Sequence, residues 1–437
     1  MHYFKKYREI FLFLACLRYA VVSESQFNKI CKRSRRNQEC SKITIERNVC
    51  NNVRHDDVPH CAVPVDELFQ GAHLRGLVDL PSFAPSWLNK TLYREGQKWA
   101  RENYSLVTFC HYVGALLVAF GADAGKVILG TGKSHVLEKA IPRYAATMRQ
   151  IWLWYDNELT NENDIVFTSL KNVRAIHQSV DVQYENSTLE QGATWIQENL
   201  NWDLDEAMWD AVLKDLNNSD IPEQYRSYSE NILENLKTSQ ITLNQFRMAV
   251  TQHLFVAIPF IVRNSIDVTN PTEEQMLGWN HLWAVLGYAL GIEDEYNVAL
   301  HPSLKEIHAY YTEFFNKIIL PGLFSIQSDS KILVEVLLQI LHKNTPTYDA
   351  VNPRLFMTFI LADVVGVKTS NMESLLTTVD KIIFHAQKPV QGLLKHGPQF
   401  LTDLVNKFTK AQAEAVMETW FKYVVKSDYL IAKYMYY

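Results

Sequence analysis

The sequence from residue 142 to residue 180, PRYAATMRQIWLWYDNELTNENDIVFTSLKNVRAIHQSV, contains two amphipathic helical patterns separated by a polar loop. The second pattern places apolar side chains at steps of three and four residues, at Val166, Leu170, Val173 and Val180, and His177 lies on the same stripe. Such spacing keeps side chains on one face of a helix. The pattern therefore predicts a helix that buries the imidazole of His177 among apolar residues.

Two arginines and a threonine accompany this histidine. In the first pattern Arg143 and Thr147 lie one helical turn apart, and in the second Arg174 precedes His177 by three residues. Charged and polar groups on otherwise apolar helices are costly to bury unless a ligand or a partner uses them. We therefore expect a ligand between the two helices, and a haem would use all four residues. On its own, His177 would be interpreted as a hydrogen-bonded core residue.

The spacing of these residues is similar to that of a known family. The pattern Arg-x-x-x-Thr, followed thirty residues after the threonine by the histidine of Arg-x-x-His, resembles the catalytic domain shared by bacterial rubber oxygenases (latex-clearing proteins) and fungal oxygenases of the endoplasmic reticulum that cut isoprenoid chains. Residues 251–255 (TQHLF) and 281–292 (HLWAVLGYALGI) are similar to two further segments of that domain. The resemblance is strongest over residues 63–320.

This resemblance implies an all-α fold with a b-type haem pocket. It implies that His177 is the proximal axial ligand of the haem iron, that Arg174 is a second haem-binding residue, and that Arg143 and Thr147 are catalytic residues lining the pocket. A neutral imidazole is a common axial ligand, and a single histidine leaves the other face of the iron open to dioxygen. The chain lacks a C-x-x-C-H motif, so the haem would be bound without covalent attachment.

The chain departs from the bacterial family members at two positions. They carry a lysine directly before the threonine, where this chain has Ala146. They also carry an upstream glutamate proposed as a base, and counting back along this sequence leads to Val127.

Apolar residues close in sequence to the two polar clusters favour a lipid, terpenoid or other isoprenoid ligand over a sugar or a nucleotide. These residues are Tyr144, Met148, Trp152, Val173 and Ile176. We therefore predict a haem-dependent oxidoreductase, an oxygenase that uses dioxygen to cleave or oxygenate a double bond of a small apolar, unsaturated isoprenoid or lipid substrate. Two alternatives stay open: a secreted haem- or lipid-binding protein of the same fold without turnover, and a helical structural or partner-binding protein.

The composition is that of a globular chain with a large core. Of the 437 residues, 47% are hydrophobic and 21% charged, and the formal net charge of −5 argues against binding to nucleic acid or other polyanions. Strand-like alternation does not persist, and no repeat or low-complexity linker divides the chain. The sequence therefore predicts an all-α protein with a single large helical domain over residues 63–437.

The N-terminus has the pattern of a signal peptide over residues 1–25. Lys5, Lys6 and Arg8 precede an apolar stretch of thirteen residues, 10–22, which is too short for a membrane span of about twenty residues. An uncleaved anchor is the alternative. The pattern predicts a protein that is secreted or in the lumen of the endoplasmic reticulum, with no transmembrane span after signal removal and with peripheral membrane contact left open.

Four cysteines lie close together in a Cys-rich extension, residues 26–62. They are Cys31, Cys40, Cys50 and Cys61. In an oxidising compartment such a set predicts two disulfides, with three alternative connectivities. A zinc site with His55 or His60 is the alternative, although no paired C-x-x-C spacing supports it. Cys110 is expected to be a buried thiol.

Four N-x-S/T triplets predict glycosylation in a secreted chain, at Asn89, Asn103, Asn186 and Asn217.

Local signals also predict where helices begin and end. We expect one or two helices over 92–120 that end at Gly121, glycine-rich turns over 124–132, and a helix over 241–262. Proline removes a backbone hydrogen-bond donor, so Pro142 is expected to kink or restart a helix and to leave Arg143 in the first turn after the break.

Overall fold

The computed structural model describes residues 61–425, except for 78, 81, 122–123, 160, 185–195, 197–199, 201–202, 240, 262–270 and 345–351. This part of the chain is helical and contains no β-strand, apart from one isolated bridge between Arg75 and Asn244. The all-α prediction is therefore confirmed for the described residues. The predicted signal peptide, most of the Cys-rich extension with Cys31, Cys40 and Cys50, and Asn186 lie outside them, and Cys61 is the first residue that they include.

The helices follow the chain in the order α3 (Lys90–Glu102), α4 (Tyr104–Phe120), α5 (Ala124–Gly130), α6 (Leu137–Asp156), α7 (Ile165–Tyr184), α9 (Glu206–Asn217), α10 (Glu230–Thr238), α11 (Gln245–Val256), α12 (Ile258–Ile261), α14 (Glu273–Ala289), α15 (Leu304–Phe314), α16 (Leu320–Phe324), α17 (Ser328–Asn344), α18 (Pro353–Phe359), α19 (Ser370–Ser374), α20 (Thr378–His396) and α21 (Gln399–Val425). Short π-helical turns continue α15 (Phe315–Ile319) and α18 (Ile360–Val365). Single 3₁₀ segments occupy Val65–His73, Glu223–Tyr225 and Asp294–Tyr296.

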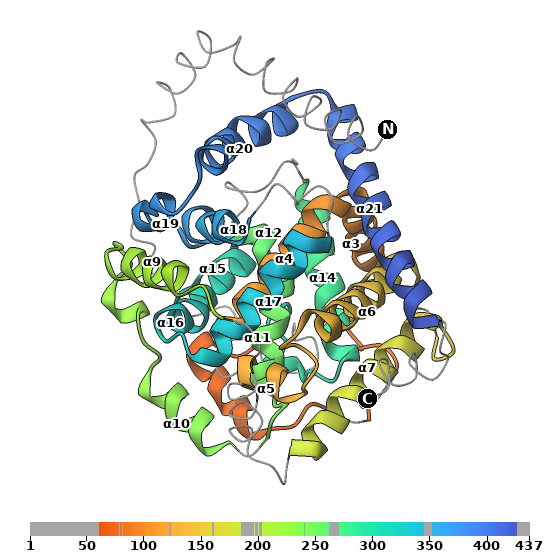
Figure 1. The fold of residues 1–437 in the computed structure, drawn as a ribbon. Helices are drawn as coiled ribbons and strands as arrows, with labels where there is room; N and C mark the ends of the chain where they lie inside the picture. Colours follow the sequence, from red (N-terminus) through yellow and green to blue (C-terminus); the bar gives the residue numbers. More distant parts are fainter. Residues whose placement is uncertain are drawn as a thin grey trace.

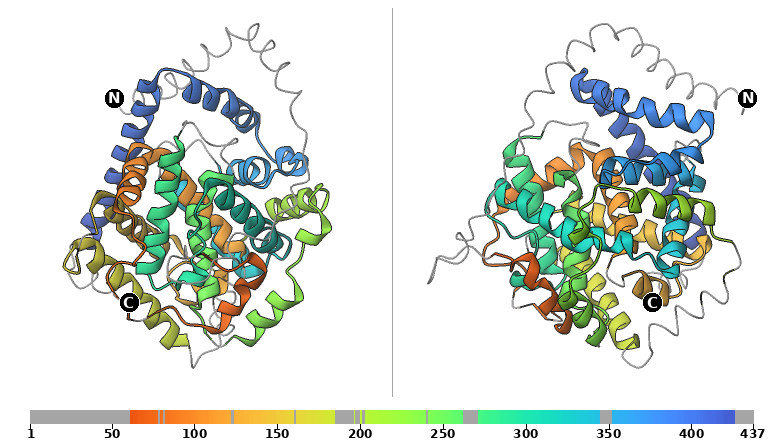
Figure 2. Two further views of the ribbon diagram at one scale, coloured as in Figure 1. Left: turned by 180° about the vertical axis from the view of Figure 1, so that it is seen from behind. Right: turned by 90° about the vertical axis from the view of Figure 1, so that its left-hand side faces the viewer.

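Helix α4 lies at the centre of the bundle (Figure 1). Its sequence is apolar on nearly every side, and most of its residues are buried against α11, α17 and α21. Helices α20 and α21 lie at the periphery in all views (Figures 1 and 2). The core is therefore built around α4, and α6, α7 and α11 lie where they can enclose a site beside it.

Helix α14 packs along α3 at very short range. A Cβ atom added at Gly96 would overlap the backbone of Gly278 on the facing helix. Glycine at this crossing therefore allows a backbone approach that any larger residue would prevent.

The prediction of one or two helices over 92–120 is confirmed, since α3 and α4 bend by 94° at their junction and α4 ends at Gly121. In the described part of the chain, no single helix is long and apolar enough to cross a membrane, and α3 and α4 reach that length only as this bent pair. At the bend, the side chain of Asn103 is buried and donates a hydrogen bond to the carbonyl of Trp99. A glycan at Asn103 would have no room in this fold.

Two local predictions were wrong. The glycine-rich stretch 124–132 was expected to be a series of turns, but residues 124–130 form α5, and the left-handed backbone is confined to Gly132, with φ of 67°. Pro142 was expected to leave Arg143 in the first turn after a break, yet α6 begins at Leu137 and continues through the proline, so Arg143 lies in its second turn. The cost is one backbone hydrogen bond near the helix start, and packing on both sides of α6 compensates for it.

Candidate functional site

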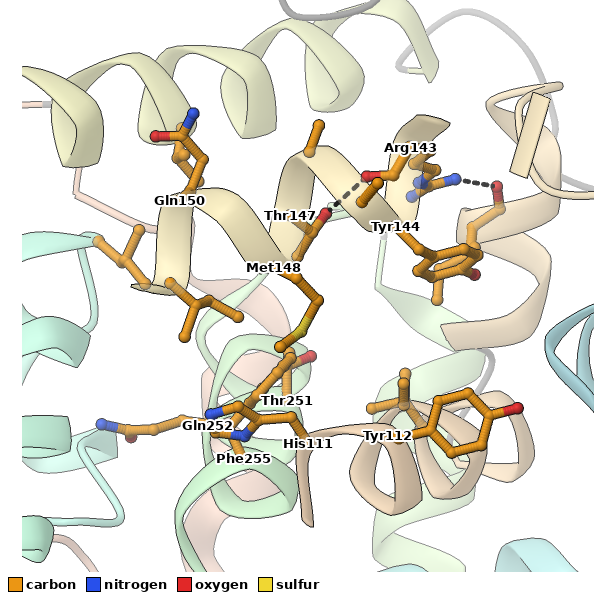
Figure 3. A pocket seen from close by; sticks show the side chains of 18 of the residues that line it. His111, Tyr112, Arg143, Tyr144, Thr147, Met148, Gln150, Thr251, Gln252 and Phe255 are labelled. Carbon is orange, nitrogen blue, oxygen red and sulfur yellow. Dashed lines mark hydrogen bonds between the residues drawn. The ribbon is translucent and has the colours of Figure 1, made fainter. Parts of the chain in front are cut away.

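A cavity of about 970 Å³ lies beside α4 and is lined by residues of α4, α6, α7 and α11, with smaller contributions from other helices. Figure 3 shows Thr147 and Met148 on the α6 side, facing Thr251 and Phe255 of α11 and His111 of α4. The walls are mainly aliphatic and aromatic. Both the size and the lining are typical of sites for apolar small molecules and cofactors.

His177 lines this cavity from α7. Its ring nitrogen Nδ1 is buried and has no hydrogen-bond partner in the part of the chain that the structure describes. Burial, helped by the positive charge of Arg143, lowers the pKa of His177 to about 4. Part of the side chain remains accessible, because His177 lines the cavity. The imidazole is therefore neutral at physiological pH, with one of its two ring nitrogens unprotonated.

Arg143 also lines the cavity, and its guanidinium is fixed by the turn between α5 and α6. Its Nη1 donates hydrogen bonds to the carbonyl of Ile128 at 3.1 Å, to Oγ1 of Thr131 at 2.9 Å and to Oγ of Ser134 at 2.6 Å. The guanidinium carbon lies 5.8 Å from the ring centre of Tyr144. These contacts place a fixed positive charge at the α5–α6 end of the cavity.

Thr147 lies one turn after Arg143 and lines the same cavity. Its hydroxyl donates to the carbonyl of Arg143 at 3.1 Å, as the dashed line in Figure 3 shows. The proton is therefore held by the helix backbone, while the oxygen lone pairs remain available to a group in the cavity.

Arg174 is placed elsewhere. Its buried guanidinium donates to the carbonyl of Ala289 at 3.1 Å, at the C-terminal end of α14, and it is not among the residues that line the cavity. The last carbonyls of a helix have no donor within the helix, so this arginine supplies one. The structure therefore brings Arg143, Thr147 and His177 together and gives Arg174 a contact between α7 and α14.

Three further residues of the cavity wall were missed in the sequence. His111, Lys133 and Arg247 all line the cavity. The Nε2 atom of His111 is 2.8 Å from the hydroxyl of Tyr155, its Nδ1 is buried without a partner in the described residues, and burial lowers its pKa to about 3. A histidine within the apolar stretch of α4 was a signal that could have identified it.

The charged side chains that line the cavity in the described part of the chain are all positive. Lys133, Arg143 and Arg247 line it, and no aspartate or glutamate among the described residues does so. Val127 and Ala146, the two positions of departure from the bacterial rubber oxygenases, also lie in the wall. Among the described residues, the wall therefore offers no carboxylate that could act as a base or bind a metal ion.

The residues present fit a haem better than a bare metal ion. In the described residues, no group of three or more histidine, cysteine or acidic side chains is placed to hold a metal ion. A haem needs only one axial side chain from the protein, and His177 offers an imidazole whose buried nitrogen has no partner in the part of the chain that the structure describes. An apolar wall suits the porphyrin, and cations suit its propionates.

The sequence matches no protein-family model and no curated protein. Among solved structures, the chain is similar to one described as "Structure of Latex Clearing Protein LCP in the closed state". The two share 14% sequence identity, 76% of each chain is covered, and the TM-score is 0.47.

Proposed function

We propose that the cavity beside α4 binds a b-type haem through His177 and that the protein is a haem-dependent oxygenase for an apolar, unsaturated lipid or isoprenoid. The observation that carries this proposal is the neutral imidazole of His177, which lines an apolar cavity and has a buried nitrogen without a partner among the described residues. A buried polar atom without a partner is costly, and a ligand would remove that cost. The spacing of Arg143, Thr147 and His177 in the sequence supports the same ligand.

The protein would supply binding, orientation and exclusion of water, while a bound haem would supply the oxygen chemistry. Aliphatic and aromatic walls such as Met148, Ile151 and Phe255 would hold a hydrocarbon chain away from water. Thr147 would accept a hydrogen bond through its free lone pairs, or donate one after rotation away from the carbonyl of Arg143. Arg143 would stabilise negative charge at its end of the cavity.

A second candidate function is haem or lipid binding without turnover. The observation that favours it is the composition of the cavity wall, which holds no carboxylate among the described residues. The wall has Val127 and Ala146 where the bacterial rubber oxygenases carry a glutamate and a lysine. A reaction that needs a carboxylate base would have none within this wall.

Product analysis distinguishes the two functions. The haem-loaded protein is incubated with unsaturated isoprenoids and fatty acids under labelled dioxygen, and products are identified by mass spectrometry. The oxygenase proposal predicts that label enters a cleaved or oxygenated product, and that boiled protein and haem alone give no more than background. Absence of labelled product across the panel, with haem bound at one equivalent, would favour the non-catalytic binder.

A further inference from the structure

The positive end of the cavity lies at the turn between α5 and α6. Lys133 lines the cavity from this turn, and its neighbours Thr131 and Ser134 both accept hydrogen bonds from Arg143. The same arginine binds the carbonyl of Ile128 at the end of α5. These three contacts fix the turn. Lys133 lies close enough to Arg143 for the positive charge of the guanidinium to act on its ammonium group, so both cations belong to the same end of the cavity.

Within the described residues, no acidic side chain balances these two charges. In the described part of the chain, neither Lys133 nor Arg143 forms an ion pair with a carboxylate, and no aspartate or glutamate lines the cavity. Lys133 is half-buried, and burial together with the charge of Arg143 lowers the pKa of its ammonium. Like charges held together at the edge of an apolar space repel each other unless an anion joins them.

The rest of the cavity limits what that anion can be. From the cationic end, the wall continues through apolar side chains such as Ile141, Met148 and Ile151. A small inorganic anion would leave this apolar space unused. A diphosphate would bring more charge than two cations balance, and the described cavity wall has no carboxylate that could bind a metal ion with it. A single carboxylate on a large apolar body matches both parts of the cavity.

We propose that Lys133 and Arg143 form a carboxylate-binding site at the α5–α6 end of the cavity, where they hold the acidic end of a ligand whose apolar body fills the remaining space. Two sources of carboxylate share this chemistry: a long-chain fatty or isoprenoid acid, and the propionates of a haem. The site goes beyond the proposed function, because its contacts are formed by the protein alone and do not depend on His177.

The first test compares an acid with a neutral ligand of the same length. Oleate and oleyl alcohol are titrated into ligand-free protein, and binding is followed by the fluorescence of the tryptophans in the wall, Trp152, Trp154 and Trp283. We expect oleate to bind about tenfold more tightly than the alcohol, as one charge-assisted contact allows. Lys133→Met should remove this preference, and Lys133→Arg should keep it. Lys139→Met, a matched change at an exposed lysine of α6 outside the cavity, should have no effect.

The second test uses haem and haem dimethyl ester, in which the propionates carry no charge. A preference for haem that Lys133→Met removes identifies a propionate as the bound carboxylate, whereas a preference for oleate alone identifies a free acid. Equal binding within both pairs of ligands would overturn the proposal, as would a preference that Lys133→Met leaves intact. A preference for oleate in a protein that binds no haem would leave this site standing while the oxygenase proposal fails.

Discussion

Replacing Arg174 with methionine separates a structural role from a haem-binding role. The buried guanidinium donates to the carbonyl of Ala289, the last residue of α14. Loss of a hydrogen bond from a charged donor to a buried carbonyl costs about 1.5–3 kcal/mol. Methionine keeps part of the apolar contact. It also removes the cost of burying the guanidinium, a cost that shows in the lowered pKa of Arg174 and offsets part of the loss. We therefore expect the free energy of unfolding to fall by about 1–2 kcal/mol.

Two measurements on the same variant test this role. Urea unfolding, followed by circular dichroism, gives the free energy of unfolding, and haem titration gives the affinity of the cavity. Arg174→Met should lower the first and leave the second unchanged, because Arg174 does not line the cavity. Lys171→Met, at an exposed position of the same helix, should change neither. Unchanged stability combined with about a tenfold loss of haem affinity, a difference of about 1.4 kcal/mol, would refute this reasoning and make Arg174 a haem-binding residue.

Three further predictions concern turnover, acid stability and the N-terminal cysteines. Thr147→Val keeps the shape of the side chain and removes its hydroxyl, so turnover of an unsaturated lipid should fall at least about tenfold while haem absorbance stays constant; an unchanged rate in a steady-state product assay would exclude a catalytic role. Several histidines are neutral in the fold because burial lowers their pKa to about 3 or 4: His111, His177, His253, His281 and His301. These histidines take up protons near pH 6.5 in the unfolded chain but not in the folded chain. As the pH is lowered from 6.5 to 4, the free energy of unfolding should therefore fall by up to about 1.4 kcal/mol per histidine for each pH unit. Urea midpoints that stay constant from pH 7 to 4.5 would contradict this. Mass spectrometry of the secreted protein under non-reducing conditions should show two disulfides among Cys31, Cys40, Cys50 and Cys61. Four free thiols would contradict the pairing, and a retained Met1 would contradict cleavage of the signal peptide.

Much of the helical architecture could be predicted because its cause is local. The stripe that contains Val166 and Leu170 predicted a helix, and α7 covers it with both side chains fully buried. The bend between α3 and α4 agrees with the expectation of one or two helices ending at Gly121. In each case the period of apolar residues or a strong terminator determines the outcome.

The errors arise where tertiary contacts outweigh local preference. Glycine is a weak helix former, yet Gly125 lies inside α5, where an added Cβ would meet the carbonyl of Ala119 at 3.1 Å. Pro142 remains inside α6, because the helix is held on both sides of it. Propensity alone cannot show such contacts, since they join residues that are distant in the sequence.

The site could be predicted only in part, for the same reason. Arg143, Thr147 and His177 share a cavity, as their spacing suggested. Arg174 lies on the flank of the same helix, and its contact with Ala289 joins residues 115 positions apart. Lys133 owes its place to the hydrogen bonds of Arg143 on either side of it. Helical period specifies the face on which a residue lies, but not which neighbour that face meets.

Haem binding by His177 is tested most directly by titrating haem into the purified protein and into two histidine variants, with absorbance as the readout. His301 is a matched control, because it too has a buried nitrogen without a partner in the described residues and a pKa that burial lowers to about 4, yet it does not line the cavity. We predict one equivalent of haem with the spectrum of histidine-ligated iron in the wild-type protein and in His301→Ala. His177→Ala should lose that spectrum while its helical circular dichroism stays unchanged. An unaltered haem spectrum in a folded His177→Ala protein, or no haem uptake by the wild type, would contradict the proposal.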